Sequence, residues 1–391
     1  MCRSAQAPVL LGIGAFVVGT CELVLAGLLP ELARSLGIAV ATAGQVVTIF
    51  GVTAAIAGPA LAAATVRRGP QRVLLLALIF YLLGTALSSA AGSFVLLLGA
   101  QVLAACGAGL FLPTATVVAA ELVEQERRGR AVATVTTGMT VAIAIGAPLG
   151  TALAAVTDWR VTMATLSALA LLVGVAVLRW VPQVRTSDHD AMGLRQRWAP
   201  LVDRRVLALL VTTLVSFTAI YIPYTYISVV LADSTRGNGL WLAAVMSVLG
   251  ISGIAGNFLA GRLADRFGGR PVVAGALLGL IAVFVLIPLW STTIATSLLA
   301  AAAYGLIGFG VTAPQTYRIL ALGGRTSLTV ALNGAALYVA IALSGVLGGV
   351  AVTVLGPNSL GPLATAGLVL ALGTSELAHH LTSNSQATAR T

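Results

Sequence analysis

The chain has 391 residues, of which 58% are hydrophobic and only 9% are charged. About a quarter of the residues in an ordinary soluble domain are charged, so this composition excludes that class and indicates an integral membrane protein. All 22 basic residues are arginines, and the formal net charge is +10. Because nearly all of them lie in short loops between apolar runs, they indicate membrane orientation, and we expect no nucleic-acid partner.

The sequence shows no motif for binding a metal ion or a nucleotide. The cysteines and histidines show no metal-ligand spacing, so we expect neither a metal nor a cofactor; they are Cys2, Cys21, Cys106, His189, His379 and His380. No GxxxxGK[ST] loop is present, and no hydrophilic stretch is long enough to hold a nucleotide-binding domain. An ATP-driven pump is therefore excluded, and transport would use a gradient.

Twelve apolar runs are each long enough to cross a bilayer as a helix. They are 8–30, 41–64, 72–91, 94–117, 131–155, 160–181, 206–231, 239–260, 271–290, 292–314, 328–355 and 359–378. We predict an all-α integral membrane fold of two pseudo-symmetric six-helix bundles. The predicted parts are an N-terminal bundle (1–181), a cytoplasmic linker (182–205), a C-terminal bundle (206–378) and a cytoplasmic tail (379–391).

Arginines accumulate on one side of this topology. Only three fall on the other side: Arg34, Arg160 and Arg236. The positive-inside rule therefore places both termini and the linker in the cytoplasm. We expect a multi-pass protein of the cytoplasmic membrane. The basic loops contain Arg67, Arg68, Arg72, Arg127, Arg128, Arg130, Arg185, Arg195, Arg197, Arg204, Arg205, Arg262, Arg266, Arg270, Arg318 and Arg325.

The first run, "GTCELVLAGLLPEL", contains a glutamate at Glu22. Small residues share its helical face, which suits the interior of a bundle; they are Gly12, Ala15, Gly19 and Ala26. We therefore expect Glu22 to face protein or a cavity. An ionisable residue inside the membrane indicates a proton or cation site, and the alternative is a structural hydrogen bond to a neighbouring helix.

The two halves of the sequence resemble each other. Gly69 aligns with Gly268, and at the same offset Gly146 falls on Gly345. "GRLADRFGGR", between the eighth and ninth runs, together with twelve spans, resembles the cytoplasmic loop signature of the major facilitator superfamily. The resemblance implies a cytoplasmic gate at Gly261, Asp265, Arg266, Gly268 and Arg270. In the first half, Ala62 and Val66 replace the glycine and aspartate of that signature.

The fifth run carries "GMTVAIAIGAPLGT", which is similar to the antiporter motif of the drug-exporting branches of this superfamily. The resemblance implies a sealed helix contact at Gly138, Gly146, Pro148 and Gly150; ordinary small-residue packing is the alternative. The first run also resembles chloramphenicol exporters of actinobacteria. In such proteins an arginine occupies the position of Gln101, at nearly the depth of Glu22. We predict that Gln101 modulates Glu22 through a hydrogen bond. Because a glutamine replaces the arginine here, it stays open whether transport is coupled to protons.

Few other polar side chains fall inside the runs. We predict that the substrate site uses Gln45, Asn257 and Asn333, and that Tyr221 and Tyr224 offer it aromatic faces and hydroxyls. For these two tyrosines, anchoring at the membrane interface is the alternative.

These features lead to one prediction and its rivals. We predict a monomeric efflux transporter and not an enzyme. It would exchange a small amphipathic compound, such as a chloramphenicol-like antibiotic, for protons by alternating access. The alternatives are an uptake permease for a sugar or other nutrient, an intramembrane enzyme, which would need a second catalytic group near Glu22, and a non-transporting sensor.

Overall fold

The computed structural model describes residues 2–65, 68–182, 203–322 and 326–388, with side chains described within 6–65, 68–182, 203–322 and 329–381. All the regular elements in these ranges are helices. The predicted linker lies almost wholly outside them, as do Val66, Arg67, Arg185, His189, Arg195, Arg197 and Arg325. The described residues divide into two compact units, one within 1–191 and 238–247, the other within 192–237 and 248–391.

The helices of the first half match the predicted apolar runs closely. They are α1 (Cys2–Leu36), α2 (Val40–Ala43), α3 (Gln45–Ala64), α4 (Pro70–Ser89), α5 (Phe94–Glu121), α6 (Arg128–Val141), α7 (Ala147–Val156) and α8 (Trp159–Trp180). A 3-10 turn, η1 (Gln125–Arg127), precedes α6, and a π turn, η2 (Ala142–Gly146), joins α6 to α7.

The second half repeats this pattern with more interruptions. Its helices are α10 (Arg204–Thr225), α11 (Ile227–Val230), α12 (Ala232–Thr235), α13 (Gly239–Phe267), α14 (Gly269–Val285), α15 (Ile287–Trp290), α16 (Ile294–Gly308), α17 (Thr312–Leu320), α18 (Thr326–Val354) and α19 (Leu360–Thr388). Two 3-10 turns are η4 (Phe309–Val311) and η5 (Pro357–Ser359). The final helix continues into the segment predicted to be a tail.

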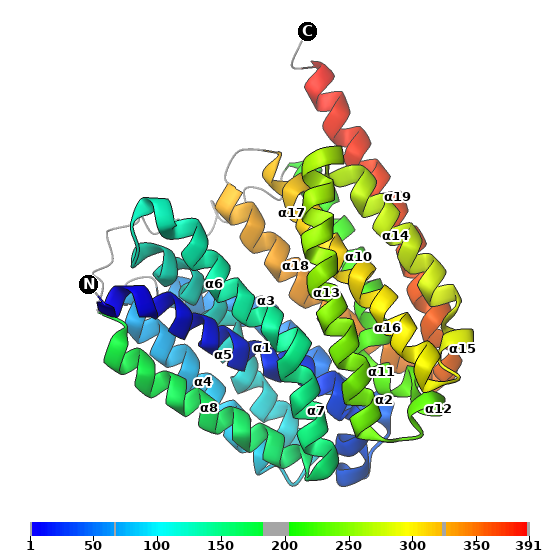
Figure 1. The fold of residues 1–391 in the computed structure, drawn as a ribbon, viewed down its shortest axis with the longest axis horizontal. Coiled ribbons are helices and arrows are strands. Elements are labelled where there is room, and N and C mark those ends of the chain that lie inside the picture. The colour runs from blue at the N-terminus through cyan, green and yellow to red at the C-terminus, as the bar shows by residue number, and fades with distance from the viewer. Residues whose placement is uncertain (1, 66–67, 183–202, 323–325, 389–391) are drawn as a thin grey trace. The chain divides into compact units, whose positions relative to one another are not determined.

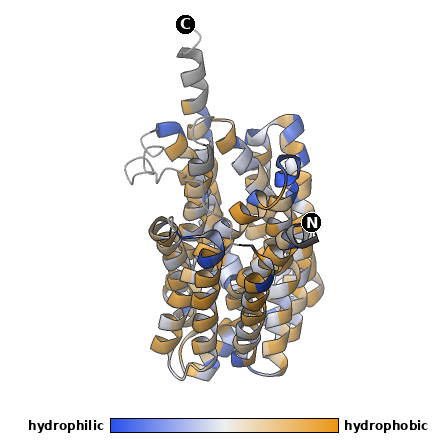
Figure 2. Cartoon of the chain, turned by 90° about the vertical axis from the view of Figure 1, so that its left-hand side faces the viewer, coloured by the Kyte–Doolittle hydropathy of each residue, from blue (hydrophilic) through white to orange (hydrophobic). Residues whose placement is uncertain are grey.

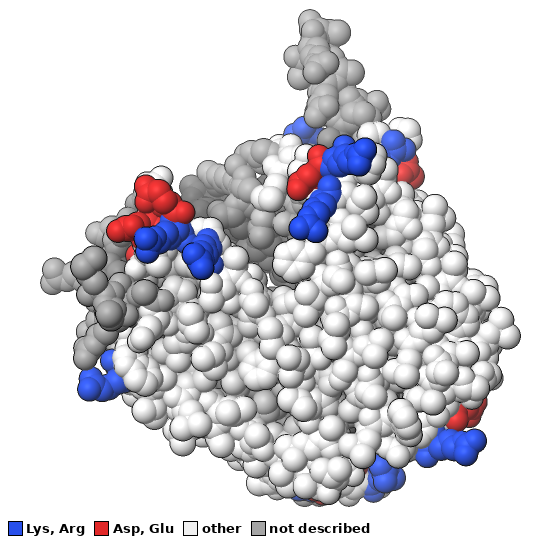
Figure 3. All heavy atoms as spheres, in the orientation of Figure 1, with Lys and Arg blue, Asp and Glu red and all other residues white. Residues whose placement is uncertain are grey.

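Eleven helices of the described chain are long and apolar enough to cross a membrane, and α14 is a shorter apolar helix. The predicted span 271–290 corresponds to α14 and α15, which meet at Leu286. Hydrophilic residues gather toward the helix ends in Figure 2, and in Figure 3 charged atoms also lie at those ends. Large apolar side chains on the outward faces, such as Leu149, Leu172 and Phe258, provide the lipid-facing surface that a bilayer requires.

Polar side chains cap the N-termini of several helices. The Ser93 hydroxyl accepts a hydrogen bond from the Leu96 N–H (3.3 Å) at the start of α5, and Asp158 caps α8 through the Arg160 N–H (2.7 Å). Asp203 caps α10, and hydrogen bonds from Arg205 hold the pKa of this carboxyl below its usual range. Such caps satisfy amide groups that have no partner within the helix.

The same helix pairs recur in both units (Figure 1). In the first unit α1 packs against α6 and α8, and α4 against α5 and α8; in the second, α10 packs against α18 and α19, and α14 against α16 and α19. Because the first, third, fourth, fifth and sixth spans of each half pair alike, the predicted pseudo-symmetry of the two bundles is confirmed.

Close packing in the first unit gives a stability test. At Gly107 of α5, a Cβ would lie 2.6 Å from the Tyr81 backbone nitrogen of α4, whereas at Gly99 of the same helix it would meet no atom of the described part of the chain within 4 Å. Gly107→Val should therefore destabilise the protein by about 1–3 kcal/mol through overpacking, and Gly99→Val should have little effect. The measurement is the temperature at which half of the detergent-solubilised protein is lost from the monodisperse peak. Equal losses in the two variants would contradict this packing.

Candidate functional site

Glu22 lies near the middle of α1, in the apolar span Gln6–Leu36. Its side chain is only 8% exposed, and the small residues of its face, including Ala15 and Ala26, are buried as well. The prediction that this face turns toward protein is confirmed. Glu22 is therefore an ionisable side chain enclosed by protein inside a membrane span, which makes it a candidate functional residue.

The motif glycines of the fifth span bring that helix into direct contact with α1. A Cβ at Gly138 would collide with the carbonyl oxygen of Gly12, and one at Gly146 would meet the ring of Phe16 at 3.1 Å and the hydroxyl of Thr20. At Gly150 a Cβ would lie 2.7 Å from Val24. The seam therefore follows α1 on both sides of Glu22 and needs small residues at the motif positions.

The helix winding changes inside this motif. Residues Ala142–Gly146 form a π turn, and Pro148 follows at the start of α7. Proline has no N–H to donate to the carbonyl group of Ala144, and π turns often accompany such interruptions of the α-helical ladder. The sequence motif indicated a sealed contact but gave no sign of the wider turn.

Gln101 lies in α5 and is fully buried. Its Nε2 donates a hydrogen bond to the Ser88 hydroxyl of α4 (3.0 Å), and its Oε1 has no hydrogen-bond partner among the described residues. The structure therefore places the amide donor toward α4. The influence of Gln101 on Glu22 stays a prediction.

The tyrosines of α10 differ in their surroundings. Tyr224 is 5% exposed and Tyr221 is half-buried, and their rings meet edge to face with centroids 5.8 Å apart. Phe217 lies 6.4 Å from the Tyr221 ring, and Tyr304 of α16 donates its hydroxyl hydrogen to the carbonyl group of Ile220. Tyr224 thus packs inside the second unit, and Tyr221 offers the more accessible ring.

The remaining predicted polar residues are dispersed over three helices. Gln45 begins α3 and is half-buried. Asn257 of α13 holds a buried Oδ1 without a hydrogen-bond partner among the described residues. Asn333 of α18 accepts a hydrogen bond from Thr213 of α10 at 2.7 Å. A common substrate site for all of them stays a prediction.

The predicted cytoplasmic gate occupies the junction of α13 and α14. Gly268 has a φ of 83°, a conformation that favours glycine, and Arg270 follows in the first turn of α14. Asp265 and Arg266 are exposed in the last turn of α13, and the Arg266 guanidinium lies 5.1 Å from the Phe267 ring centroid. At Gly261 an added Cβ would meet no atom of the described residues within 4 Å, so their packing does not explain this glycine.

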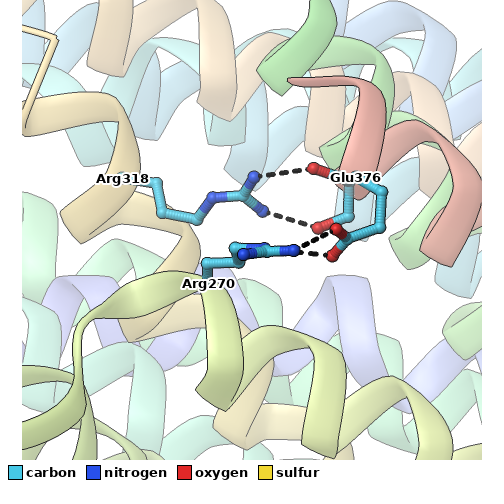
Figure 4. Close-up of polar contacts among 4 residues, drawn as sticks. Arg270, Arg318 and Glu376 are labelled. Carbon is cyan, nitrogen blue, oxygen red and sulfur yellow. Dashed lines mark hydrogen bonds and ion pairs between the residues drawn. The ribbon is translucent and has the colours of Figure 1, made fainter. Parts of the chain in front are cut away.

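Arg270 belongs to a polar cluster that sequence analysis missed (Figure 4). Its guanidinium pairs with the carboxylate of Glu376 in α19, with an Nε–Oε1 distance of 3.2 Å. Beside it, Arg318 of α17 binds the hydroxyl (2.8 Å) and the carbonyl oxygen (3.0 Å) of Ser375. Gln315, three residues before Arg318, is also part of the cluster. That spacing places both on one helix face and was the available sequence signal.

The Arg270–Glu376 pair is suited to a double-mutant cycle. Both side chains are partly exposed, 44% and 40%, so solvent screening keeps their coupling energy small. We expect a small but measurable coupling from Arg270→Gln, Glu376→Gln and the double variant, measured as denaturation free energy in detergent. The matched control is Arg127–Glu124, which is 3.9 Å apart with side chains 74% and 79% exposed, and it should show no measurable coupling. Additive losses at Arg270 and Glu376 would mean that their contact contributes nothing.

Comparisons with known proteins agree with this architecture. The family model described as Major Facilitator Superfamily matches residues 11–349. A bacterial homologue of the human lysosomal transporter Spinster, in an inward-facing crystal structure, superposes with a TM-score of 0.75 at 14% sequence identity, over 97% of each chain. At this identity the likeness concerns the fold alone.

Sequence relatives carry more information about function. An uncharacterized MFS-type transporter of Bacillus subtilis is 29% identical and covers 91% of this chain and 90% of its own. A chloramphenicol resistance protein of Streptomyces lividans is 35% identical over 69% of each chain. A chloramphenicol efflux pump of Mycobacterium tuberculosis is 28% identical over 77% of this chain and 71% of its own. By its family match, its helices and its relatives, this chain is a multi-pass membrane transporter of the major facilitator superfamily.

Proposed function

We propose that the protein is a secondary efflux transporter that exports a small amphipathic compound in exchange for protons. The observation that carries the proposal is Glu22, a carboxyl group with 8% exposure midway along an apolar transmembrane helix. In such a place an ionisable group is costly to keep, which favours a functional role. A carboxyl group at this place can bind and release a proton.

The direction of transport is inferred from the seam and from the relatives. The contact of Gly138 and Gly146 with α1 is the kind of tight helix seam expected to limit leak beside Glu22. Two relatives carry chloramphenicol resistance or efflux in their names, which supports a chloramphenicol-like antibiotic as the substrate.

We further propose a monomer in the cytoplasmic membrane with both termini in the cytoplasm, in keeping with the arginine distribution.

Tyr221 supports an amphipathic substrate. A half-buried aromatic ring next to Phe217 can contact an apolar ring, and its hydroxyl can serve a polar substituent. Binding sites for such compounds combine mostly apolar walls with a few polar groups, and the predicted site residues have that composition.

The test is proton movement in proteoliposomes that carry a pH gradient. Adding chloramphenicol, within a panel of antibiotics, should dissipate the gradient in the wild-type protein. In Glu22→Gln the compound-driven proton flux should fall to the level of empty liposomes, because the amide cannot bind or release the proton.

Glu31→Gln is the matched control, since Glu31 lies on the same helix and its partner is the nearby Arg34, 3.5 Å away. That variant should keep the flux. Equal proton flux in wild type and Glu22→Gln would remove Glu22 from the coupling. Compound movement without any proton flux would overturn antiport.

A further inference from the structure

A chain of hydrogen bonds inside the second unit joins Arg318 to Asn333. Arg318 donates to the Oε1 atom of Gln315 (3.3 Å), and the Nε2 atom of Gln315 donates to the Thr213 hydroxyl (3.1 Å). The Thr213 hydroxyl in turn donates to the Oδ1 atom of Asn333 (2.7 Å). Thr213 is fully buried and Gln315 is 2% exposed, so the bond between these two residues is shielded from water.

Arg318 fixes the order of donors and acceptors along this series of hydrogen bonds. A guanidinium group only donates hydrogen bonds, and this one is held in place by Ser375 through two further bonds. The atom of Gln315 that faces Arg318 must therefore be its oxygen. Its NH₂ group is then directed to the other side, where it meets the Leu209 carbonyl oxygen (2.9 Å) and Thr213.

Thr213 accepts a hydrogen bond from Gln315 and donates one to Asn333, so the order of donor and acceptor is kept. Its hydroxyl accepts from Gln315 and has one hydrogen to give, either to the Leu209 carbonyl oxygen (3.1 Å) or to Asn333 (2.7 Å). That carbonyl already accepts from Gln315 and, as part of α10, from the backbone N–H of Thr213. With both lone pairs engaged, it is the poorer acceptor. The hydrogen goes to Asn333, whose oxygen must face Thr213.

We propose that this network makes Asn333 a dedicated hydrogen-bond donor to the transported compound. With Oδ1 held by Thr213, the NH₂ group is the end left to a ligand, and Asn333 is only half-buried. The compound must then carry an acceptor oxygen, such as a carbonyl or nitro oxygen, at this point. Arg318 and Gln315 are positioning residues. This inference rests on the proposed function for the existence of a transported compound, but the orientation of Asn333 does not depend on it.

Gln315→Glu should reverse the donor and acceptor roles of Thr213 and Asn333, because glutamate has nearly the shape of glutamine but offers only acceptor oxygens. One carboxylate oxygen would pair with Arg318 and the other would accept from Thr213. Thr213 would then accept from Asn333, which would turn its oxygen toward the compound. We expect chloramphenicol to bind about tenfold more weakly or worse, because two acceptors would oppose each other. Asn333→Asp should weaken binding to a similar extent.

A Thr213→Val background and a matched control variant separate this mechanism from general damage to the protein. Thr213→Val cuts the link, so Gln315→Glu should have no further effect on chloramphenicol affinity in that background. Gln71→Glu is the matched control, because Gln71 is a buried glutamine whose Nε2 donates to the Val177 carbonyl oxygen in the other unit. It should leave the affinity within about twofold. Additive effects of Gln315→Glu and Thr213→Val would overturn the transmission.

The orientation is tested independently by side-chain amide NMR of protein labelled with ¹⁵N-asparagine, with the signal assigned by its loss in Asn333→Asp. The wild-type NH₂ group should exchange rapidly with solvent, and in Gln315→Glu it should be protected and shifted. An unchanged signal would overturn the proposal. A reoriented amide with unchanged chloramphenicol affinity would overturn its role in specificity. Reorientation in a protein that neither binds nor transports the panel would refute the donor role and, separately, the proposed efflux function.

Discussion

The absence of water in the hydrocarbon core is the constraint on which the rest of this structure depends. Each polar group inside the membrane must find its partner within the protein. The backbone meets this requirement by forming helices, and their ends are completed by side chains such as Ser93 and Asp158. Polar side chains meet it by bonding across helix pairs, as Gln101 does with Ser88 and Asn333 with Thr213. A polar atom left over in this setting is therefore informative.

The constraint also explains which parts of the fold were predictable. Helices across a bilayer need long apolar runs, and the runs read from the sequence agree with most of the observed spans. The face of Glu22 was predictable because small residues recur there at helical spacing, and these residues are buried with it. Both inferences use only local order along one helix.

Contacts between helices were less predictable. Gln101 lay at a depth that suggested a partner in α1, but its donor is bonded to α4. The cluster around Arg270, Arg318 and Glu376 joins α14, α17 and α19, and single-helix patterns do not reveal which faces meet. The π turn before Pro148 likewise depends on how α6 and α7 fit against α1. In each case the side-chain types were visible in the sequence, and their partners required the tertiary structure.

The two units have the same helix pairing but place their polar groups differently. In the first, the seam beside Glu22 brings the motif glycines of the fifth span against Phe16, Thr20 and Val24 of α1. In the second, the corresponding pair α10 and α18 is joined by Thr213 and Asn333, and their bonds continue through Gln315 to Arg318. A hydrogen-bond network anchored at a group that only donates fixes the direction of a donor. The proposed proton site lies in the first arrangement, and the proposed donor to the compound lies in the second. Pseudo-symmetric units of one fold can thus take different roles, because the fold fixes which helices meet and leaves the polar residues between them free to differ.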